Sequence, residues 1–198
     1  MRHIRHPDDH GGPTEPFRWV YRMRGLLMVP LVVFLAVCPW GETESDPLVF
    51  GLGSVVFGVG LFLRVWAQMH LRYRLKAKTL LTQTGPYRHV RNPVYVGNIL
   101  ILLGCCFFAE LFWSAPFVLL YAWCVYHFVV RYEEAHLLRK HGQAYVRFCE
   151  HTPRWVPRLS PGPARKEAAT TEWITRALVA EVHNLLLLVP FLVKEILS

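Results

Sequence analysis

The chain has 198 residues, of which 53% are hydrophobic and 18% are charged, and its formal net charge is +8. An average soluble domain carries roughly a quarter charged residues and a smaller apolar share, so the composition argues against an ordinary soluble protein and predicts one membrane domain with a few spans. Basic residues in a membrane protein collect in its cytoplasmic loops, so the positive charge does not indicate a nucleic-acid partner.

The N-terminal segment, residues 1–24, is too long and in part too acidic for the charged region of a signal peptide. It ends in Phe17–Met23, whose Phe, Trp and Tyr side chains are typical of the membrane interface. The first apolar run follows at Gly25–Trp40 and is shorter than the roughly 20 residues that a span usually needs. The second run, Pro47–Trp66, is the clearest span of the chain.

Two further apolar runs, Val94–Phe108 and Pro116–Val130, are separated only by Ala109–Ala115. A connection this short permits a tight turn between two antiparallel helices, so these runs form a helical hairpin. A fifth candidate, Leu178–Leu197, is interrupted by charged and polar residues. It either spans the membrane or lies in the interface with an apolar face, and we expect a span. The sequence therefore predicts an all-α, polytopic membrane protein with four or five transmembrane helices.

The basic residues predict the orientation of these spans. Twenty of the 22 Lys and Arg residues lie in three segments, residues 1–24, 67–93 and 131–176. The connectors 41–46 and 109–115 contain none. Since cytoplasmic loops carry the excess of Lys and Arg, we expect the N-terminus and all three basic segments in the cytoplasm.

The first cytoplasmic loop carries ordered local signals. Thr84–Arg88 reads Thr-Gly-Pro-Tyr-Arg, which is a turn signature. It leads to Arg91–Pro93, where Pro93 is well placed in the first turn of the third span. Gly97 follows within the first turns of that helix and permits another backbone or a ligand to come close.

The fourth span continues into water. The segment Val130–His141 keeps a helical pattern beyond the apolar run, and Gly142 supplies a C-terminal stop. Two adjacent carboxylates, Glu133 and Glu134, lie where this helix leaves the membrane. Such a pair is explained either as a solvated helix end or as part of a site. A short helix is expected at Gln143–Glu150.

Taken together, these two loops resemble the superfamily of isoprenylcysteine carboxyl methyltransferases and phospholipid methyltransferases. The resemblance covers about residues 60–158 and consists of two motifs in order, Gly-x-Tyr-x-x-x-Arg-His-Pro-x-Tyr-x-Gly and Glu-Glu-x-x-Leu, followed by Phe-Gly-x-x-Tyr-x-x-Tyr and a Pro-rich exit. The matching residues are Gly85, Tyr87, Arg91, Pro93, Tyr95, Gly97, Glu133, Glu134, Leu137, Gly142, Tyr145, Pro153 and Pro157. Asn92 departs from the pattern, because the carboxyl-methylating members carry His there.

The resemblance implies a cytoplasmic pocket that binds S-adenosyl-L-methionine and methylates a membrane-resident or small hydrophobic acceptor: a carboxylate, an amine or a thiol. The cofactor-binding residues that it implies are Tyr87, Arg91, Pro93, Tyr95, Gly97, Glu133, Glu134 and Tyr145. Catalytic roles fall to Arg91, Asn92 and Glu134. In this picture the tyrosines form aromatic walls, Arg91 pairs with a carboxylate, and the two glutamates hold ribose hydroxyls or the ammonium group.

The chain then divides into a cytoplasmic tail at 1–24, a methyltransferase core at 25–158, and a linker with a C-terminal helix at 159–198. No metal site is expected: the five cysteines lack CxxC spacing, and the three histidines of the tail, His3, His6 and His10, lie in a Gly- and Pro-rich stretch without ligand spacing.

Two other functions stay open at this stage. Membrane sterol reductases, which use NADPH, share a similar turn before a span but usually carry Asp where this chain has Asn98. A non-enzymatic scaffold or transporter subunit is the second alternative. Transport sites usually need an ionisable relay inside the spans, and we expect none here, which argues against this alternative. His127 and Asn98 are the polar residues at membrane depth nearest the motifs, and each either functions or bonds a neighbouring helix.

Overall fold

The computed structural model describes residues 15–38, 47–76, 81–160 and 171–197. Throughout these ranges the chain is helical or loop, without strands, so the predicted all-α class is confirmed. The helices are α1 (Glu15–Met23), α2 (Val29–Val37), α3 (Pro47–Lys76), α4 (Pro93–Phe108), α5 (Ala115–His141), α6 (Gln143–His151), α7 (Thr171–Glu181) and α8 (Val189–Leu197). Four 3₁₀ turns join them: η1 (Leu26–Met28), η2 (Gly85–Arg88), η3 (Phe112–Ser114) and η4 (Val182–Leu188).

Helices long and apolar enough to cross a membrane make this an integral membrane protein. Three of the described segments are by length and composition able to cross a membrane: Pro47–Leu71, Phe112–His141 and Ile174–Val193. The fifth candidate of the sequence is therefore long enough to span. The first expected span is bent: Phe17–Met23 and Leu26–Val37 meet at 73° and are together long and apolar enough for a broken span or a re-entrant loop. The third expected span, α4, has only 16 residues.

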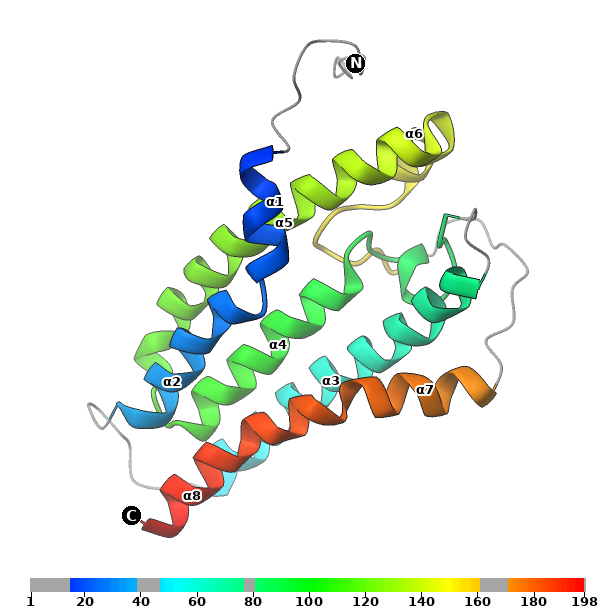
Figure 1. Cartoon of the computed structure of the whole chain (residues 1–198). Coiled ribbons are helices and arrows are strands. Elements are labelled where there is room, and N and C mark those ends of the chain that lie inside the picture. The colour runs from blue at the N-terminus through cyan, green and yellow to red at the C-terminus, as the bar shows by residue number, and fades with distance from the viewer. Residues whose placement is uncertain (1–14, 39–46, 77–80, 161–170, 198) are drawn as a thin grey trace.

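Helix α5 extends beyond its apolar part, as predicted. Its 27 residues span about 40 Å, which exceeds the roughly 30 Å of a hydrocarbon core, so its last turns continue beyond the apolar layer towards α6 (Figure 1). The helix ends where expected, at Gly142, whose φ of 51° is readily adopted only by glycine. The expected short helix follows as α6.

Helices α3 and α4 pack closely because glycines face each other. A Cβ at Gly60 would lie 2.8 Å from the Gly97 carbonyl oxygen, and a Cβ at Gly97 would lie 2.6 Å from Arg64 Cγ. Gly104 meets Phe57 of α3 in the same way, at 2.7 Å. Small residues at a helix interface allow this close approach in a membrane. Gly97 thus admits a neighbouring backbone, which is one of the two uses predicted for it.

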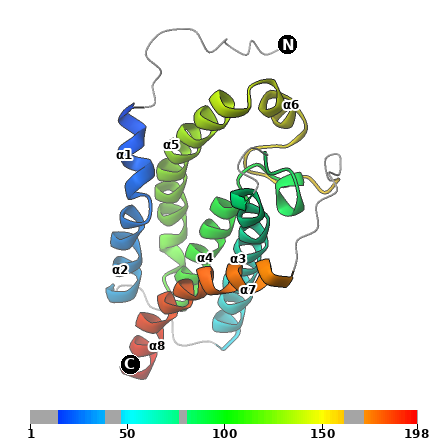
Figure 2. The ribbon, with the colours of Figure 1, turned by 45° about the vertical axis from the view of Figure 1, so that its right-hand side comes forward.

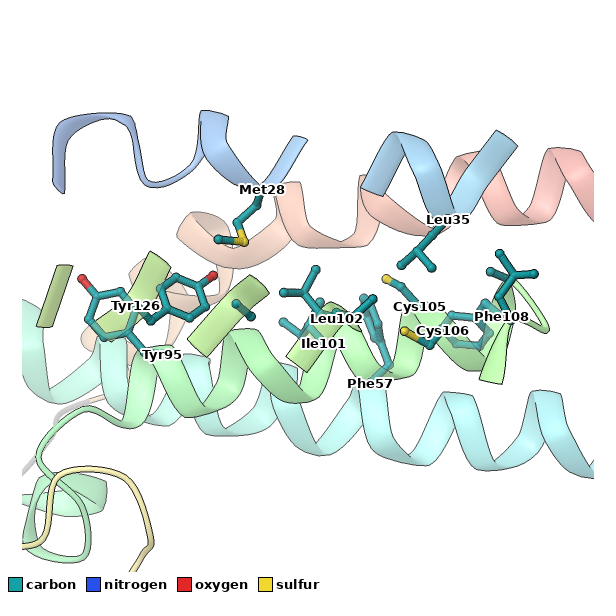
Figure 3. Packing of buried hydrophobic residues seen from close by; sticks show 14 of the residues in the cluster. Met28, Leu35, Phe57, Tyr95, Ile101, Leu102, Cys105, Cys106, Phe108 and Tyr126 are labelled. Atoms are coloured by element: carbon teal, nitrogen blue, oxygen red, sulfur yellow. The ribbon is translucent and has the colours of Figure 1, made fainter. Parts of the chain in front are cut away.

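A buried apolar cluster fills the centre of the bundle (Figure 3). It joins residues of η1 and α2, α3, α4 and α5, among them Met28, Leu35, Phe57, Leu102 and Tyr126. The outer surface of the long helices is also apolar, as expected of a surface that faces lipid. Large exposed hydrophobic side chains there include Leu52, Val55, Val59 and Phe62 of α3 and Phe117, Leu120 and Trp123 of α5.

Helix α7 lies across α3 (Figure 2) and is joined to it by a buried ion pair. Arg64 Nε donates to Glu181 Oε2 at 2.6 Å and Nη2 donates to Oε1 at 3.1 Å, while Nη1 donates to the Asn98 side chain. Asn184 Nδ2 donates to Glu181 Oε2 at 2.6 Å. Arg64 and Glu181 both lie within candidate spans, so this ion pair joins two of them.

We expect Gly60→Ala to lower the unfolding temperature of the detergent-solubilised protein, because the added methyl group would lie 2.8 Å from the Gly97 carbonyl oxygen. Overpacking of this kind costs about 1–3 kcal/mol. Gly58→Ala is the matched control, since Gly58 lies on the same helix and its added methyl group meets no atom within 4 Å. Equal unfolding temperatures in a thermal melt would contradict the close approach of α3 and α4.

We also expect Glu181→Leu to destabilise the fold by about 3–5 kcal/mol, because it leaves the Arg64 guanidinium buried without its anion. The double variant Arg64→Met/Glu181→Leu removes both charges and should regain most of that loss. Thermal melts of the two variants in the same detergent test this. A double variant no more stable than Glu181→Leu would mean that side-chain shape, and not charge, governs the contact.

Candidate functional site

Three chain segments meet at one end of the bundle: the residues before α4, the extension of α5, and the segment after α6. Figure 1 shows the last of these returning from α6 to the N-terminal end of α4. The backbone N–H of Arg91 donates to the Pro153 carbonyl at 2.8 Å, and that of Arg158 donates to the His89 carbonyl at 2.9 Å. The site is thus built from the two loops that carry the motifs.

The turn before α4 takes its shape from Gly85. This residue begins η2 with a φ of 54°, and a Cβ there would lie 2.3 Å from the His70 ring of α3. The His70 Nδ1 and the Thr84 hydroxyl are 2.7 Å apart and share a hydrogen bond. Pro93 is the first residue of α4, as predicted. Glycine is therefore required both for its backbone conformation and for its closeness to α3.

Glu134 lies at the centre of the site with only 9% of its surface exposed. Its carboxylate accepts hydrogen bonds from Arg154 Nε at 3.1 Å and Arg154 Nη2 at 2.5 Å. Arg91 Nη1 lies 3.1 Å from Glu134 Oε1. Two guanidinium groups around one carboxylate leave one positive charge uncompensated, and the buried Arg91 Nε has no hydrogen-bond partner.

Glu133 has different surroundings, although it is the next residue. Consecutive residues of a helix point about 100° apart, so its carboxylate faces another side of α5. It accepts hydrogen bonds from the hydroxyls of Tyr95 on α4 and Tyr21 on α1. The Tyr95 ring packs against Tyr126 at a centroid distance of 5.0 Å, and Figure 3 shows the two rings side by side. These hydroxyls hold the Glu133 carboxylate from two helices, α1 and α4.

Helix α6 adds a tyrosine and a thiol next to the two arginines. Burial raises the pKa of Tyr145 well above its ordinary range, and the negative charge of Glu134 acts in the same direction. Burial also raises the pKa of the Cys149 thiol, while the Arg91 cation opposes that change. Arg91 Nη1 donates to Cys149 Sγ at 3.1 Å. Both groups are therefore neutral at pH 7.

Most residues predicted for the site come together. Arg91, Glu134 and Tyr145 lie around one another, and Glu133 and Tyr95 form the adjoining contact. Asn92 Nδ2 donates to the Arg154 carbonyl at 3.3 Å, so it holds the segment that carries Arg154. Of the other three predicted residues, Pro93 begins α4 and Tyr87 is buried in η2. The Cβ position of Gly97 is directed at α3.

The polar residues at membrane depth have structural partners. Asn98 accepts a hydrogen bond from Arg64. His127 packs against Trp123 and Phe128 of its own helix, at centroid distances of 5.1 and 5.7 Å. Among the described residues there is no group of three or more His, Cys, Asp or Glu able to hold a metal ion. The tail histidines lie outside the described residues.

Sequence reasoning missed two side chains of this region, Cys149 and Tyr21. Arg154 of the Pro-rich exit is a candidate from the sequence for closing the cofactor pocket, and its contact with Glu134 comes from the structure. Cys149 and Tyr21 give no local signal, since their roles arise from packing alone.

Comparison with known proteins places the chain among methyltransferases. The phospholipid methyltransferase family model matches residues 48–144, about half of the chain. The chain is 27% identical over 152 residues to the nickel-cobalt-cadmium resistance protein NccN of Alcaligenes xylosoxydans xylosoxydans, covering 75% of this chain and 70% of the relative. It is 34% identical over 125 residues to the cobalt-zinc-cadmium resistance protein CzcN of Cupriavidus metallidurans, covering 61% of this chain and 55% of the relative.

The chain thus spans little more than half the length of the second relative. No solved structure matches it. The matched residues include α3, η2, α4 and α5, and therefore both glutamates and Arg91. With the two motifs in order and brought together in space, the chain belongs to the phospholipid methyltransferase family, within the superfamily of integral membrane methyltransferases.

Proposed function

We propose that this protein transfers the methyl group of S-adenosyl-L-methionine to a membrane-resident or small hydrophobic acceptor. The observation that carries the proposal is that the adjacent glutamates of α5 have different partners: Glu134 contacts two arginines, and Glu133 accepts from the hydroxyls of Tyr95 and Tyr21. S-adenosyl-L-methionine contains a carboxylate, an ammonium and a sulfonium, so its site needs an anion-binding part and a cation-binding part.

The residues present fit such a ligand. The buried Arg91 Nε lacks a hydrogen-bond partner, and an unpaired buried donor is costly unless a ligand or water satisfies it. A carboxylate oxygen is the strongest acceptor available for a guanidinium. On the other side, the Glu133 carboxylate, held by two tyrosine hydroxyls, is suited to the cationic part of the ligand. Tyr145 and Tyr95 offer aromatic faces for the adenine or the cation.

When bound, the cofactor supplies an electrophilic methyl group on sulfur. Methyl transfer is an in-line displacement in which positioning supplies much of the acceleration. Arg91 and Arg154 orient the ligand carboxylate, while Asn92 keeps the Arg154 segment in place through the 3.3 Å hydrogen bond to its carbonyl. The buried surfaces of Tyr145 and Phe148 exclude water from this side.

The acceptor class decides whether a base is needed. A carboxylate or thiolate attacks without one, whereas an amine must first lose a proton. Glu133 and Glu134 are the candidates within this site to take that proton. We place the site and the N-terminus on the cytoplasmic side, since the basic residues gather there.

We expect the detergent-purified protein to bind S-adenosylhomocysteine, and Arg91→Gln to weaken that binding by roughly ten- to a hundredfold, the value of a hydrogen bond to a charged group. Isothermal titration calorimetry measures both. Arg147→Gln, on the exposed side of α6, is the control and should bind like the wild type. Binding of NADPH in place of S-adenosylhomocysteine would instead identify a reductase.

We further expect iodoacetamide to alkylate Cys149 more slowly than free glutathione at pH 7, because burial raises the pKa of its thiol and the thiolate is the reactive form. The alkylation rate of Cys149 should rise with pH and reach half its maximum at a higher pH than the alkylation rate of glutathione does. S-adenosylhomocysteine should protect Cys149, which touches Arg91. Mass spectrometry of the Cys149 peptide reads both effects, and fast alkylation unchanged by the ligand would contradict this site.

A further inference from the structure

Helix α1 lies outside the residues that match the family model, yet it packs along the part of α5 that carries the two glutamates. Figures 1 and 2 both show α1 beside α5. The Phe17 ring stacks on Phe128 at a centroid distance of 5.1 Å, and the Tyr21 ring lies 5.0 Å from that of Tyr132. The exposed side chains of α1, Arg18, Trp19 and Arg22, are on its other face.

Tyr21 is fixed by contacts on several sides. Its ring packs against Tyr132, which directly precedes Glu133 in the chain. The Arg24 guanidinium covers the ring at 4.4 Å from its centroid, and Arg24 Nη1 donates to the Tyr21 carbonyl at 2.8 Å. With its ring held in this way, the Tyr21 hydroxyl donates to the Glu133 carboxylate.

We propose that Tyr21 is a positioning residue of the site, whose hydroxyl acts together with that of Tyr95 to hold the Glu133 carboxylate towards the cationic part of the methyl donor. The inference rests on the proposed function. One donor would leave a carboxylate free to rotate about its last bond, whereas donors on α1 and α4 hold it from two sides. Neither hydroxyl carries a charge, so neither of these two contacts competes as a cation with a sulfonium or ammonium group.

The chain offers a matched control. Tyr121 of α5 also ties this helix to the N-terminal segment through its hydroxyl, which donates to the Leu27 carbonyl at 2.7 Å. It precedes Glu133 by twelve residues, or about 18 Å along the helix axis. Tyr21→Phe and Tyr121→Phe therefore remove the same group and the same kind of tether, but only Tyr21→Phe changes the surroundings of Glu133.

The first measurement is the affinity for S-adenosyl-L-methionine of the full-length protein in detergent. We expect Tyr21→Phe to weaken binding about tenfold, as for a hydrogen bond to a charged group, and Tyr121→Phe to change it less than about twofold, within the scatter of distant sites. In a Glu133→Gln background, Tyr21→Phe should have little further effect, because it acts through Glu133. Equal losses from both tyrosine variants, or an undiminished loss in the Glu133→Gln background, would overturn the inference.

A second measurement needs no ligand. Thermal unfolding of the wild type, Tyr21→Phe, Glu133→Gln and the double variant forms a double-mutant cycle for the contact itself. Non-additive unfolding temperatures are expected, and strict additivity would overturn the inference. If the wild type binds neither S-adenosyl-L-methionine nor S-adenosylhomocysteine, the proposed function fails, while the cycle still reports whether Tyr21 and Glu133 are coupled.

Discussion

The site depends on one buried carboxylate. A carboxylate with 9% exposure, as at Glu134, is tolerated only when cations and donors surround it, and Arg91 and Arg154 reach it from two different loops. Once these arginines converge, the chain on either side of each is brought close enough for the backbone hydrogen bond from Arg91 to Pro153. The charge of Glu134 therefore assembles the end of the bundle as well as compensating its own burial.

The geometry of α5 then separates the two glutamates. Because adjacent residues in a helix diverge by about 100°, one carboxylate is directed to the arginines of the loops and the other to tyrosines of α1 and α4. Two neighbouring carboxylates thereby contact different groups within a short distance. The pair also lies where α5 continues past its apolar part, which is where the proposed function needs a soluble cofactor and a membrane-embedded acceptor to meet.

Local sequence signals predicted the helices and their ends, but they could not predict contacts between residues far apart in the chain. Pro93 at the start of α4, Gly142 at the end of α5 and the short α6 follow from residues adjacent to each boundary. The pair Arg64–Glu181 joins residues 117 positions apart, and no local pattern indicates which cation meets which anion. Glu181 in an apolar run still indicates that a partner exists, because an unpaired charge inside a span is costly. Two basic residues, Arg64 and Lys194, lie outside the three basic segments.

The cost of leaving a polar group unpaired in apolar surroundings also links the matched core to the helices that flank it. Residues 48–144, which match the family model, include Arg64 and Glu133 but neither Glu181 nor Tyr21. Without α7, the Arg64 guanidinium would keep only Asn98 as a described partner, and without α1, Glu133 would lose the Tyr21 hydroxyl. Because polar groups in apolar surroundings must be satisfied within the protein, the flanking helices α1 and α7 supply partners that charged residues of the matched core need.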